Sequence, residues 1–80
     1  MSSVYVLKSL RNGKRYIGST ELNPEERLKR HNSGTNQFTK RNGPFVLVYR
    51  EQCTDKTASR KRENFLKSGV GRKYLDSILS

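Results

Sequence analysis

The large apolar residues of this chain are grouped in a few short runs, and this grouping most constrains what the chain can fold into. Val4 to Leu7, Tyr16 to Gly18 and Phe45 to Tyr49 are rich in β-forming residues, which is typical of strands. Asn12-Gly13 lies between the first two runs and predicts a β-hairpin. A disordered basic segment would scatter its apolar residues, so we infer that the chain folds.

Helix signals lie between and after these strands. Asn23 to Glu26 is a helix start, because Asn caps the backbone and proline suits the first helical position. This helix is expected to run to about His31 or Asn32, with Gly34 as its stop. A second helix is expected over Lys56 to Ser68, and a last short helix over residues 74–79.

The order of elements is therefore β-β-α-β-α-α, with no repeated β-α-β unit. We predict an α+β fold in which helices pack on a small antiparallel sheet. The continuous apolar run Phe45 to Tyr49 favours a strand covered on both faces. With 80 residues there is material for one core, so residues 1–80 are expected to form a single domain.

Charge and cysteine content narrow the possible functions. The chain has 17 Lys and Arg against 7 Asp and Glu, a net charge of +10, so its natural partner should be anionic. No run approaches the roughly 18 apolar residues of a membrane span, and we expect a cytoplasmic protein without membrane contact. One cysteine, Cys53, and one histidine exclude an internal disulfide and a zinc site.

The first predicted helix is too polar to exist mainly for burial. Leu28 is the only large apolar residue from Glu25 to His31. Arg27 and His31 are four residues apart and share one helix face, where both side chains can reach one phosphate. The alternative is a solvated helix whose charges pair with its own glutamates.

The register of the hairpin decides whether two phenols meet. A four-residue loop sets Tyr5 opposite Gly18 and places Tyr5 and Tyr16 on one face, about 7 Å apart, with Gly18 leaving space for a substrate group. A two-residue turn separates the phenols by roughly 13 Å, and a three-residue loop places them on opposite faces. The plain alternative is that both tyrosines pack in the core with their hydroxyls at the surface.

Glu63 is the only acid between Lys56 and Lys73. One interpretation is an ion pair with Lys67, four residues later on the same helix. The other is a metal ligand, because Mg²⁺ keeps several waters and shares its remaining positions with substrate phosphates.

Taken together and in this order, these residues resemble the GIY-YIG nuclease domain. Tyr16-Ile17-Gly18 matches the second motif, and Ser3-Val4-Tyr5 retains the tyrosine of the first. Glu26 to Gly34 resembles the helix that carries the family's arginine and histidine, and Arg62-Glu63 resembles the helix with its glutamate. The similarity covers nearly the whole chain and is greatest to small stand-alone bacterial members related to the UvrC nuclease domain.

The resemblance implies a three-stranded antiparallel sheet flanked by helices and an endonuclease that hydrolyses nucleic-acid phosphodiesters, DNA more than RNA, in repair or recombination. It implies one Mg²⁺ or Mn²⁺ ion, held by Glu63. The implied catalytic residues are Tyr5, Tyr16, Arg27, His31 and Glu63. Arg27 neutralises phosphoryl charge, and Tyr16, or else His31, takes the proton of water although a phenol is a weak base at neutral pH.

Substrate contacts are expected from the hairpin and from exposed cations. The residues concerned are Gly18, Ser19, Lys14, Arg15, Lys40, Arg41 and Arg60. Phosphate contacts carry no sequence information, so we expect recognition of shape, or a partner protein that supplies target specificity. A catalytically silent, basic nucleic-acid-binding module of the same fold is the alternative, and cleavage that depends on Glu63 separates the two.

Overall fold

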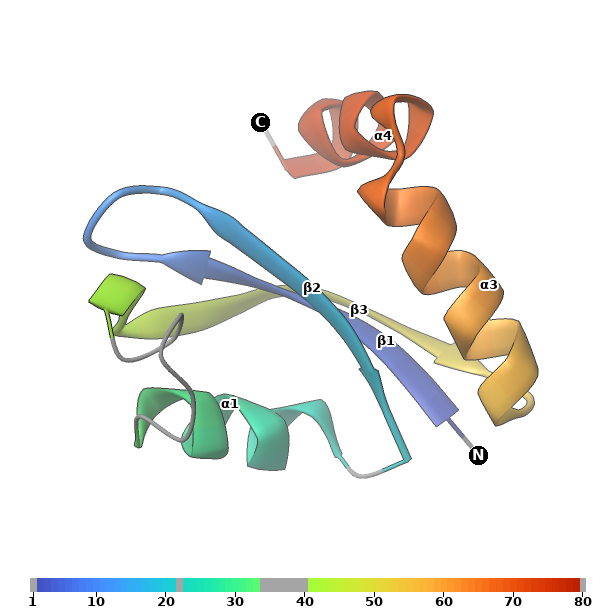
Figure 1. Ribbon diagram of the computed structural model, residues 1–80, viewed down its shortest axis with the longest axis horizontal. Helices are drawn as coiled ribbons and strands as arrows, with labels where there is room; N and C mark the ends of the chain where they lie inside the picture. Colours follow the sequence, from blue (N-terminus) through green and yellow to red (C-terminus); the bar gives the residue numbers. More distant parts are fainter. Residues whose placement is uncertain (1, 22, 34–40, 80) are drawn as a thin grey trace.

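The computed structural model describes residues 2–21, 23–33 and 41–79 of the chain (Figure 1). Three strands form one antiparallel sheet: β1 (Ser2–Ser9), β2 (Arg15–Thr20) and β3 (Phe45–Cys53). Three helices accompany it: α1 (Pro24–Asn32), α3 (Lys56–Lys67) and α4 (Gly69–Leu79). The predicted α+β class and the order β-β-α-β-α-α are confirmed. The last helix is longer than expected, because Gly69 begins α4 directly after α3 ends.

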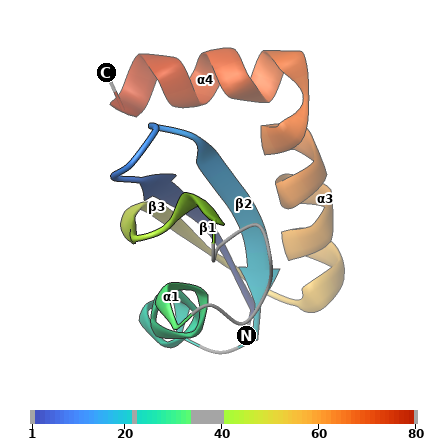
Figure 2. The same cartoon turned by 60° about the vertical axis from the view of Figure 1, so that its left-hand side comes forward.

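The sheet has the order β2-β1-β3, with α1 on one face and α3 and α4 on the other (Figures 1 and 2). The central strand is β1, in which Val4 to Leu7 are all buried. The expectation that Phe45 to Tyr49 forms a strand covered on both faces is only partly right, because the run packs against helices on both faces but lies at the edge of the sheet. This run belongs to an edge strand, and Val46 is 37% exposed.

A bulge explains why an edge strand carries five apolar residues in a row. Val6 pairs with Tyr49 but Leu7 pairs with Leu47, so Val48 is an extra residue in β3. An extra residue reverses the alternation of side chains between the two faces. Leu47 accordingly packs on the α1 side, and Val48 and Tyr49 both pack on the α3 side.

The sheet separates two small apolar clusters. On the α3 and α4 side the buried members are Val4, Val6, Leu66 and Leu75. On the α1 side they are Tyr5, Leu7 and Phe45, with Tyr16 and Leu28 packed against them. The alternation of β1 thus sends its aromatic residue towards α1 and its valines towards the C-terminal helices.

The hairpin has the register that brings the two phenols together. Tyr5 pairs with Gly18 and Leu7 with Tyr16, and the backbone N–H of Ser9 donates to the carbonyl of Lys14 at 2.8 Å. The four-residue loop is therefore confirmed. Gly13 in this loop has φ +75°, a conformation that glycine adopts without a steric penalty.

Polar side chains fix both ends of α1. Asn23 caps the start, its Oδ1 accepting from the backbone N–H of Glu25 at 3.0 Å. At the other end the Asn32 amide accepts from the backbone N–H of Phe45 at 2.8 Å and donates to the Phe45 carbonyl at 3.2 Å. Asn32 thus ties the end of α1 to the start of β3. The expected stop, Gly34, lies outside the described residues.

Among the helices that the structure describes, none combines the length and the apolar character that crossing a membrane requires.

Candidate active site

Three rings from separate elements meet on the α1 face of the sheet. The ring centroids of Tyr16 and His31 are 4.6 Å apart, those of Tyr5 and His31 6.1 Å, and those of Tyr5 and Tyr16 6.4 Å. The strands supply the tyrosines through the hairpin register, and α1 supplies the histidine. The structure therefore brings together three residues that the sequence predicts for the site.

His31 and Tyr5 are buried and joined by a hydrogen bond. The Tyr5 hydroxyl oxygen and His31 Nε2 are 3.1 Å apart, and the residues are 1% and 3% exposed respectively. The alternative of a solvated α1 is wrong for the face that carries His31. The alternative for Tyr5 is half right, because its ring packs in the core while its hydroxyl faces His31 rather than the surface.

Arg27 completes this cluster. Its guanidinium hydrogen-bonds the Tyr5 hydroxyl, whereas the glutamates of α1 pair elsewhere, Glu25 with Arg50 at 3.2 Å and Glu26 with Lys29 at 3.9 Å. Burial raises the pKa of Tyr5, and the hydrogen bond from Arg27 opposes that rise without cancelling it. Burial and the nearby Arg27 charge both lower the pKa of His31. At neutral pH, Tyr5 is a protonated phenol and His31 a neutral imidazole.

Two buried polar atoms of the cluster lack a hydrogen-bond partner among the described residues: Arg27 Nε and His31 Nδ1. A buried donor or acceptor without a partner costs about 1–3 kcal/mol, so such atoms are few in folded proteins. Both occur here in one cluster, one turn of α1 apart. The cluster therefore holds two polar atoms whose hydrogen-bonding capacity no described residue uses.

Gly18 has a different role from the one predicted. A Cβ at this position would lie 2.6 Å from the Tyr5 hydroxyl and 3.3 Å from the Tyr16 ring. The space beside Gly18 is therefore filled by Tyr5, and the expectation that it is left open for a substrate group is wrong. Glycine is needed here because the Tyr5 side chain crosses the backbone of β2.

Glu63 approaches from the opposite face of the sheet. It belongs to α3, which packs on the far side of the edge strand β2, and the Ser19 side chain hydrogen-bonds its carboxylate. Its Oε2 also accepts from Lys67 Nζ at 2.7 Å, and its side chain is 18% exposed. The ion-pair interpretation of Glu63 is thus confirmed as a contact. Its charge acts on Tyr5 as well, which brings the carboxylate within electrostatic reach of the phenols.

The pKa of Glu63 reflects this position. Burial raises the pKa of Glu63. The hydrogen bonds from Lys67 and Ser19 and the charge of Arg60 lower it by more than burial raises it, so the pKa lies below its usual value. The carboxylate is therefore ionised at neutral pH. Ser19, predicted as a substrate contact, acts in this structure as a support for Glu63.

The donor set suits only one kind of metal site. The described part of the chain holds no group of three or more His, Cys, Asp or Glu side chains that could surround an ion. A closed site of the zinc type is excluded for these residues. A single ionised carboxylate fits an ion that takes its other ligands from water and substrate phosphate, as Mg²⁺ does.

The remaining predicted contacts are dispersed. Lys14 and Arg15 lie on the hairpin, where Arg15 pairs with Asp76 at 2.7 Å. Arg41 is exposed, with its carbonyl accepting from Arg11 at 2.9 Å. Arg60 is exposed on α3, where its charge acts on Glu63. Lys40 lies outside the described residues.

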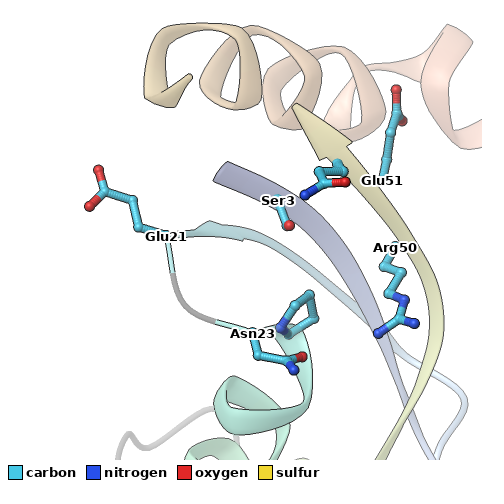
Figure 3. Close-up of a pocket in the computed structure, with 7 residues that line it drawn as sticks. Ser3, Glu21, Asn23, Arg50 and Glu51 are labelled. Atoms are coloured by element: carbon cyan, nitrogen blue, oxygen red, sulfur yellow. The ribbon is translucent and has the colours of Figure 1, made fainter. Parts of the chain in front are cut away.

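Another cavity, of about 610 Å³, lies between the start of α1 and the ends of the strands (Figure 3). Figure 3 shows Glu21, Arg50 and Glu51 around it. Arg50 pairs with Glu25, and Glu51 pairs with Arg62 at 2.9 Å. Because Arg50 and Glu51 are already paired within the protein, this cavity has no cluster comparable to that of Tyr5, His31 and Arg27.

Sequence reasoning missed two residues near the site. The sequence indicates Lys67 as an ion-pair partner of Glu63 and Arg72 as one of the cations around it, and it predicts neither as a site residue. Both line a groove that includes Tyr16. The only signal in the sequence is the density of Lys and Arg in this region, because the path of α4 past the hairpin depends on tertiary packing.

Comparisons with known proteins agree with this geometry. A sequence profile described as the GIY-YIG catalytic domain matches residues 1–75. The chain is 36% identical over 81 residues to the UPF0213 protein CPE1444 of Clostridium perfringens, covering all of this chain and 85% of that protein. It is 36% identical over 66 residues to the UPF0213 protein DP2720 of Desulfotalea psychrophila, covering 80% of this chain and 58% of that protein. No solved structure gives a significant match.

The profile covers both tyrosines, the α1 pair and Glu63, which are the residues around which the structure builds its polar cluster. The match extends over nearly the whole chain and includes every strand. The chain therefore belongs to the GIY-YIG catalytic domain family, a family of nuclease type.

Proposed function

We propose that this protein is a divalent-metal-dependent endonuclease that hydrolyses nucleic-acid phosphodiesters, DNA in the first place. The main support is the cluster of Tyr5, Tyr16, Arg27 and His31, in which Arg27 Nε and His31 Nδ1 are buried without partners. These atoms belong to a guanidinium and an imidazole, groups that bind phosphate oxygens. Glu63 supplies a carboxylate from the opposite face of the sheet, within electrostatic reach of Tyr5.

The proposal gives His31 a donor role. The Tyr5 hydroxyl accepts from Arg27 and lies 3.1 Å from His31 Nε2, and we assign its proton to this contact with Nε2. In this tautomer His31 Nδ1 carries the other proton and can donate it in a hydrogen bond but cannot accept one. His31 therefore orients a phosphate oxygen or the attacking water, with Tyr5 holding the imidazole in place.

This leaves Tyr16 as the group that takes the proton of water. Tyr16 is half-buried and lies at the open side of the cluster, where it also lines a surface groove. Arg27 neutralises the charge that gathers on the phosphoryl oxygens as water attacks, an effect that typically contributes 10²–10³-fold to the rate.

Glu63 is the residue that would hold a divalent ion. When bound, such an ion polarises the scissile phosphate and stabilises the departing oxygen. The carboxylate is ionised and accepts a hydrogen bond from the Ser19 side chain. Lys67 contacts one of the two carboxylate oxygens. A cation would therefore bind the other oxygen, or would replace the Lys67 ammonium.

A nicking assay tests this function. Supercoiled plasmid, branched DNA and RNA are incubated with wild-type protein in Mg²⁺, in Mn²⁺ and in EDTA. We expect cuts only with metal, and a loss of about 10²–10³-fold in rate in Arg27→Ala and at least as large a loss in Glu63→Ala. Lys29→Ala on the same helix and Glu21→Ala, both exposed positions, should cut like the wild type.

One observation favours a second function. The Lys67 ammonium already neutralises the Glu63 carboxylate, as it would in a nucleic-acid-binding module without catalysis. Equal cutting by wild type and Glu63→Ala on all substrates, with binding intact, would establish that module and overturn the endonuclease.

A further inference from the structure

A groove of about 750 Å³ lies between the β1–β2 hairpin and the C-terminal helices. The hairpin supplies Lys8, Gly13, Lys14, Arg15, Tyr16 and Ile17, and the helices supply Lys67, Arg72, Leu75 and Asp76. Figure 2 shows α4 passing above the hairpin. The ion pair of Arg15 with Asp76 joins the two walls at 2.7 Å.

The walls of this groove are strongly cationic. They carry five Lys and Arg side chains and a single acid, Asp76, which is already paired with Arg15. Lys8, Lys14 and Arg72 are exposed and form no ion pair within the part of the chain that the structure describes. Cations gathered in a groove repel one another and focus a positive potential there, which attracts a polyanion.

The groove begins at the candidate active site. Tyr16 lies in its wall and also contacts His31, with ring centroids 4.6 Å apart. Lys67 lies in its wall and also holds Glu63. A nucleic-acid strand bound in the groove therefore reaches Tyr16 of the catalytic cluster and lies next to Lys67, the partner of the Glu63 carboxylate.

The size and lining of the groove select its occupant. Cavities of about 300–1,000 Å³ enclose ligands of drug size, which corresponds to about one or two nucleotides and not to a duplex. Tyr16, Ile17 and Leu75 add an aromatic and apolar lining between the cations. Cationic grooves with an aromatic surface are the usual sites for unpaired strands, because the cations follow the phosphates and the ring faces receive sugars and bases.

We propose that this groove binds the single-stranded nucleic acid that continues from the scissile phosphate, with Lys14 and Arg72 as phosphate ligands on opposite walls. This inference rests on the proposed endonuclease function and deepens it, since it assigns the substrate an unpaired strand next to the cut. It also gives α4 a function: the helix completes the second wall of the groove.

Binding without metal tests the inference separately from cleavage. A fluorescein-labelled oligothymidylate of about 12 nucleotides and a blunt DNA hairpin are titrated with the full chain in EDTA, and anisotropy is followed at several salt concentrations. We expect Lys14→Gln/Arg72→Gln to weaken binding of the oligothymidylate at least tenfold. The slope of log K against log salt should become shallower by about 1.4, because each lost phosphate contact on a single strand contributes about 0.7.

A matched control removes the same charge elsewhere. Lys56 and Lys61 are exposed on α3 and do not line the groove, so Lys56→Gln/Lys61→Gln should weaken binding less than threefold and leave the slope unchanged. Lys14→Arg/Arg72→Lys, which keeps the charge, should bind within threefold of wild type. Circular dichroism confirms that each variant is folded.

Three results would overturn the proposal: equal weakening by both Gln variants, no rescue by the charge-preserving variant, or a larger loss on the hairpin duplex than on the single strand. The outcome is independent of catalysis. A wild type that shows the expected binding pattern but makes no metal-dependent cuts supports the groove and overturns the endonuclease. A wild type that cuts but whose binding ignores the groove variants overturns the groove alone.

Discussion

Gly18 is the residue on which the arrangement of the two phenols most directly depends. The Tyr5 side chain crosses β2 at the position where any other residue would carry its Cβ. The position of Gly18 in the second motif thus follows from packing. The tyrosine of one strand reaches the histidine of α1 only because the neighbouring strand has no side chain in between.

Gly18→Ala should therefore disturb both stability and activity. The new Cβ would lie 2.6 Å from the Tyr5 hydroxyl, and forcing a methyl group into such a packed site costs about 1–3 kcal/mol. We expect urea denaturation to show this loss, with cleavage reduced at least tenfold because Tyr5 and Tyr16 must move. Gly69→Ala is the control, since a Cβ at Gly69 meets nothing within 4 Å. Equal stability of the two variants would contradict the packing argument.

His31 makes stability depend on pH in a defined window. Burial and Arg27 lower its pKa below the ordinary value of 6.5, so the unfolded chain takes up a proton that the native protein does not. Stability should be fully present above about pH 6.5 and fall as the pH drops through that value, levelling off once the native histidine is also protonated.

Thermal unfolding followed by circular dichroism between pH 7.5 and 5 measures this effect. His31 is the only histidine of the chain, so His31→Gln should give a flatter profile in that window. Glu63 contributes separately. Its pKa is lowered in the native protein, so its contribution to stability is present above about pH 4.5 and is lost as the pH falls below that value. If Tm falls equally steeply with pH in the wild type and in His31→Gln, His31 is not the origin of the pH dependence.

At the scale of elements, α1 is held by few contacts. Its buried residues are Pro24 and His31, and Leu28 packs against the cluster of Tyr5, Leu7 and Phe45. The Asn32 side chain adds two hydrogen bonds to the backbone of Phe45. Because Asn32 follows His31 directly, this connection also fixes the end of the helix from which His31 projects.

Asn32→Ala should release this end of α1. Two lost hydrogen bonds of about 1 kcal/mol each predict a loss of about 2 kcal/mol and a fall in Tm of about 10 °C. Asn32→Asp keeps the acceptor and should lose about half as much. Ser33→Ala removes a hydrogen bond within the helix end only, from Ser33 Oγ to the Arg30 carbonyl, and serves as the control. A loss in Ser33→Ala as large as that in Asn32→Ala would contradict the role of Asn32.

The sequence predicts elements well where the signal is local. The cap at Asn23 and the helix from Pro24 are determined by residues within a few positions of one another, and the i,i+4 spacing places Arg27 and His31 on one face. The length of the hairpin loop is decided by the structure among three that the sequence allows. The bulge at Val48 was not predictable, because it depends on the pairing of β3 with β1, which lies roughly forty residues earlier in the chain. A regular strand of five apolar residues has apolar side chains on both faces, which is why the run favours a strand covered on both faces.

The site was predictable for the same reason and to the same extent. Helix periodicity places Arg27 and His31 on one face, whereas the hairpin register that brings Tyr5 beside Tyr16 is one of three that the sequence allows. The approach of Glu63 around the edge of β2 and the support from Ser19 depend on how α3 packs on the far face. Packing between distant elements has no local signature, so Ser19 was assigned to the substrate instead.

For the molecule as a whole, the net charge of +10 dominates the electrostatics. The ion pairs of the described residues lie at the surface, where such pairs typically contribute about 0–1 kcal/mol. The repulsion among the excess cations should therefore outweigh these pairs in the folded state.

Added salt should then stabilise the protein. Raising NaCl from about 20 to 300 mM shortens the screening length, and we expect Tm to rise because repulsion weakens more than the few ion pairs do. Lys56→Gln/Lys61→Gln, with a smaller net charge, should show a smaller rise. A Tm that falls with salt would show that the ion pairs, and not the excess charge, control stability.

The central position of β1 has a consequence for biosynthesis. Its valines are covered by Leu66 and Leu75 of the last two helices, and its Tyr5 and Leu7 by residues of α1 and β3. The valines of β1 are therefore fully covered only once the last two helices have been translated. Folding of this domain has to wait until the ribosome has released residues as far as α4, and until then the many lysines and arginines keep the nascent chain in solution.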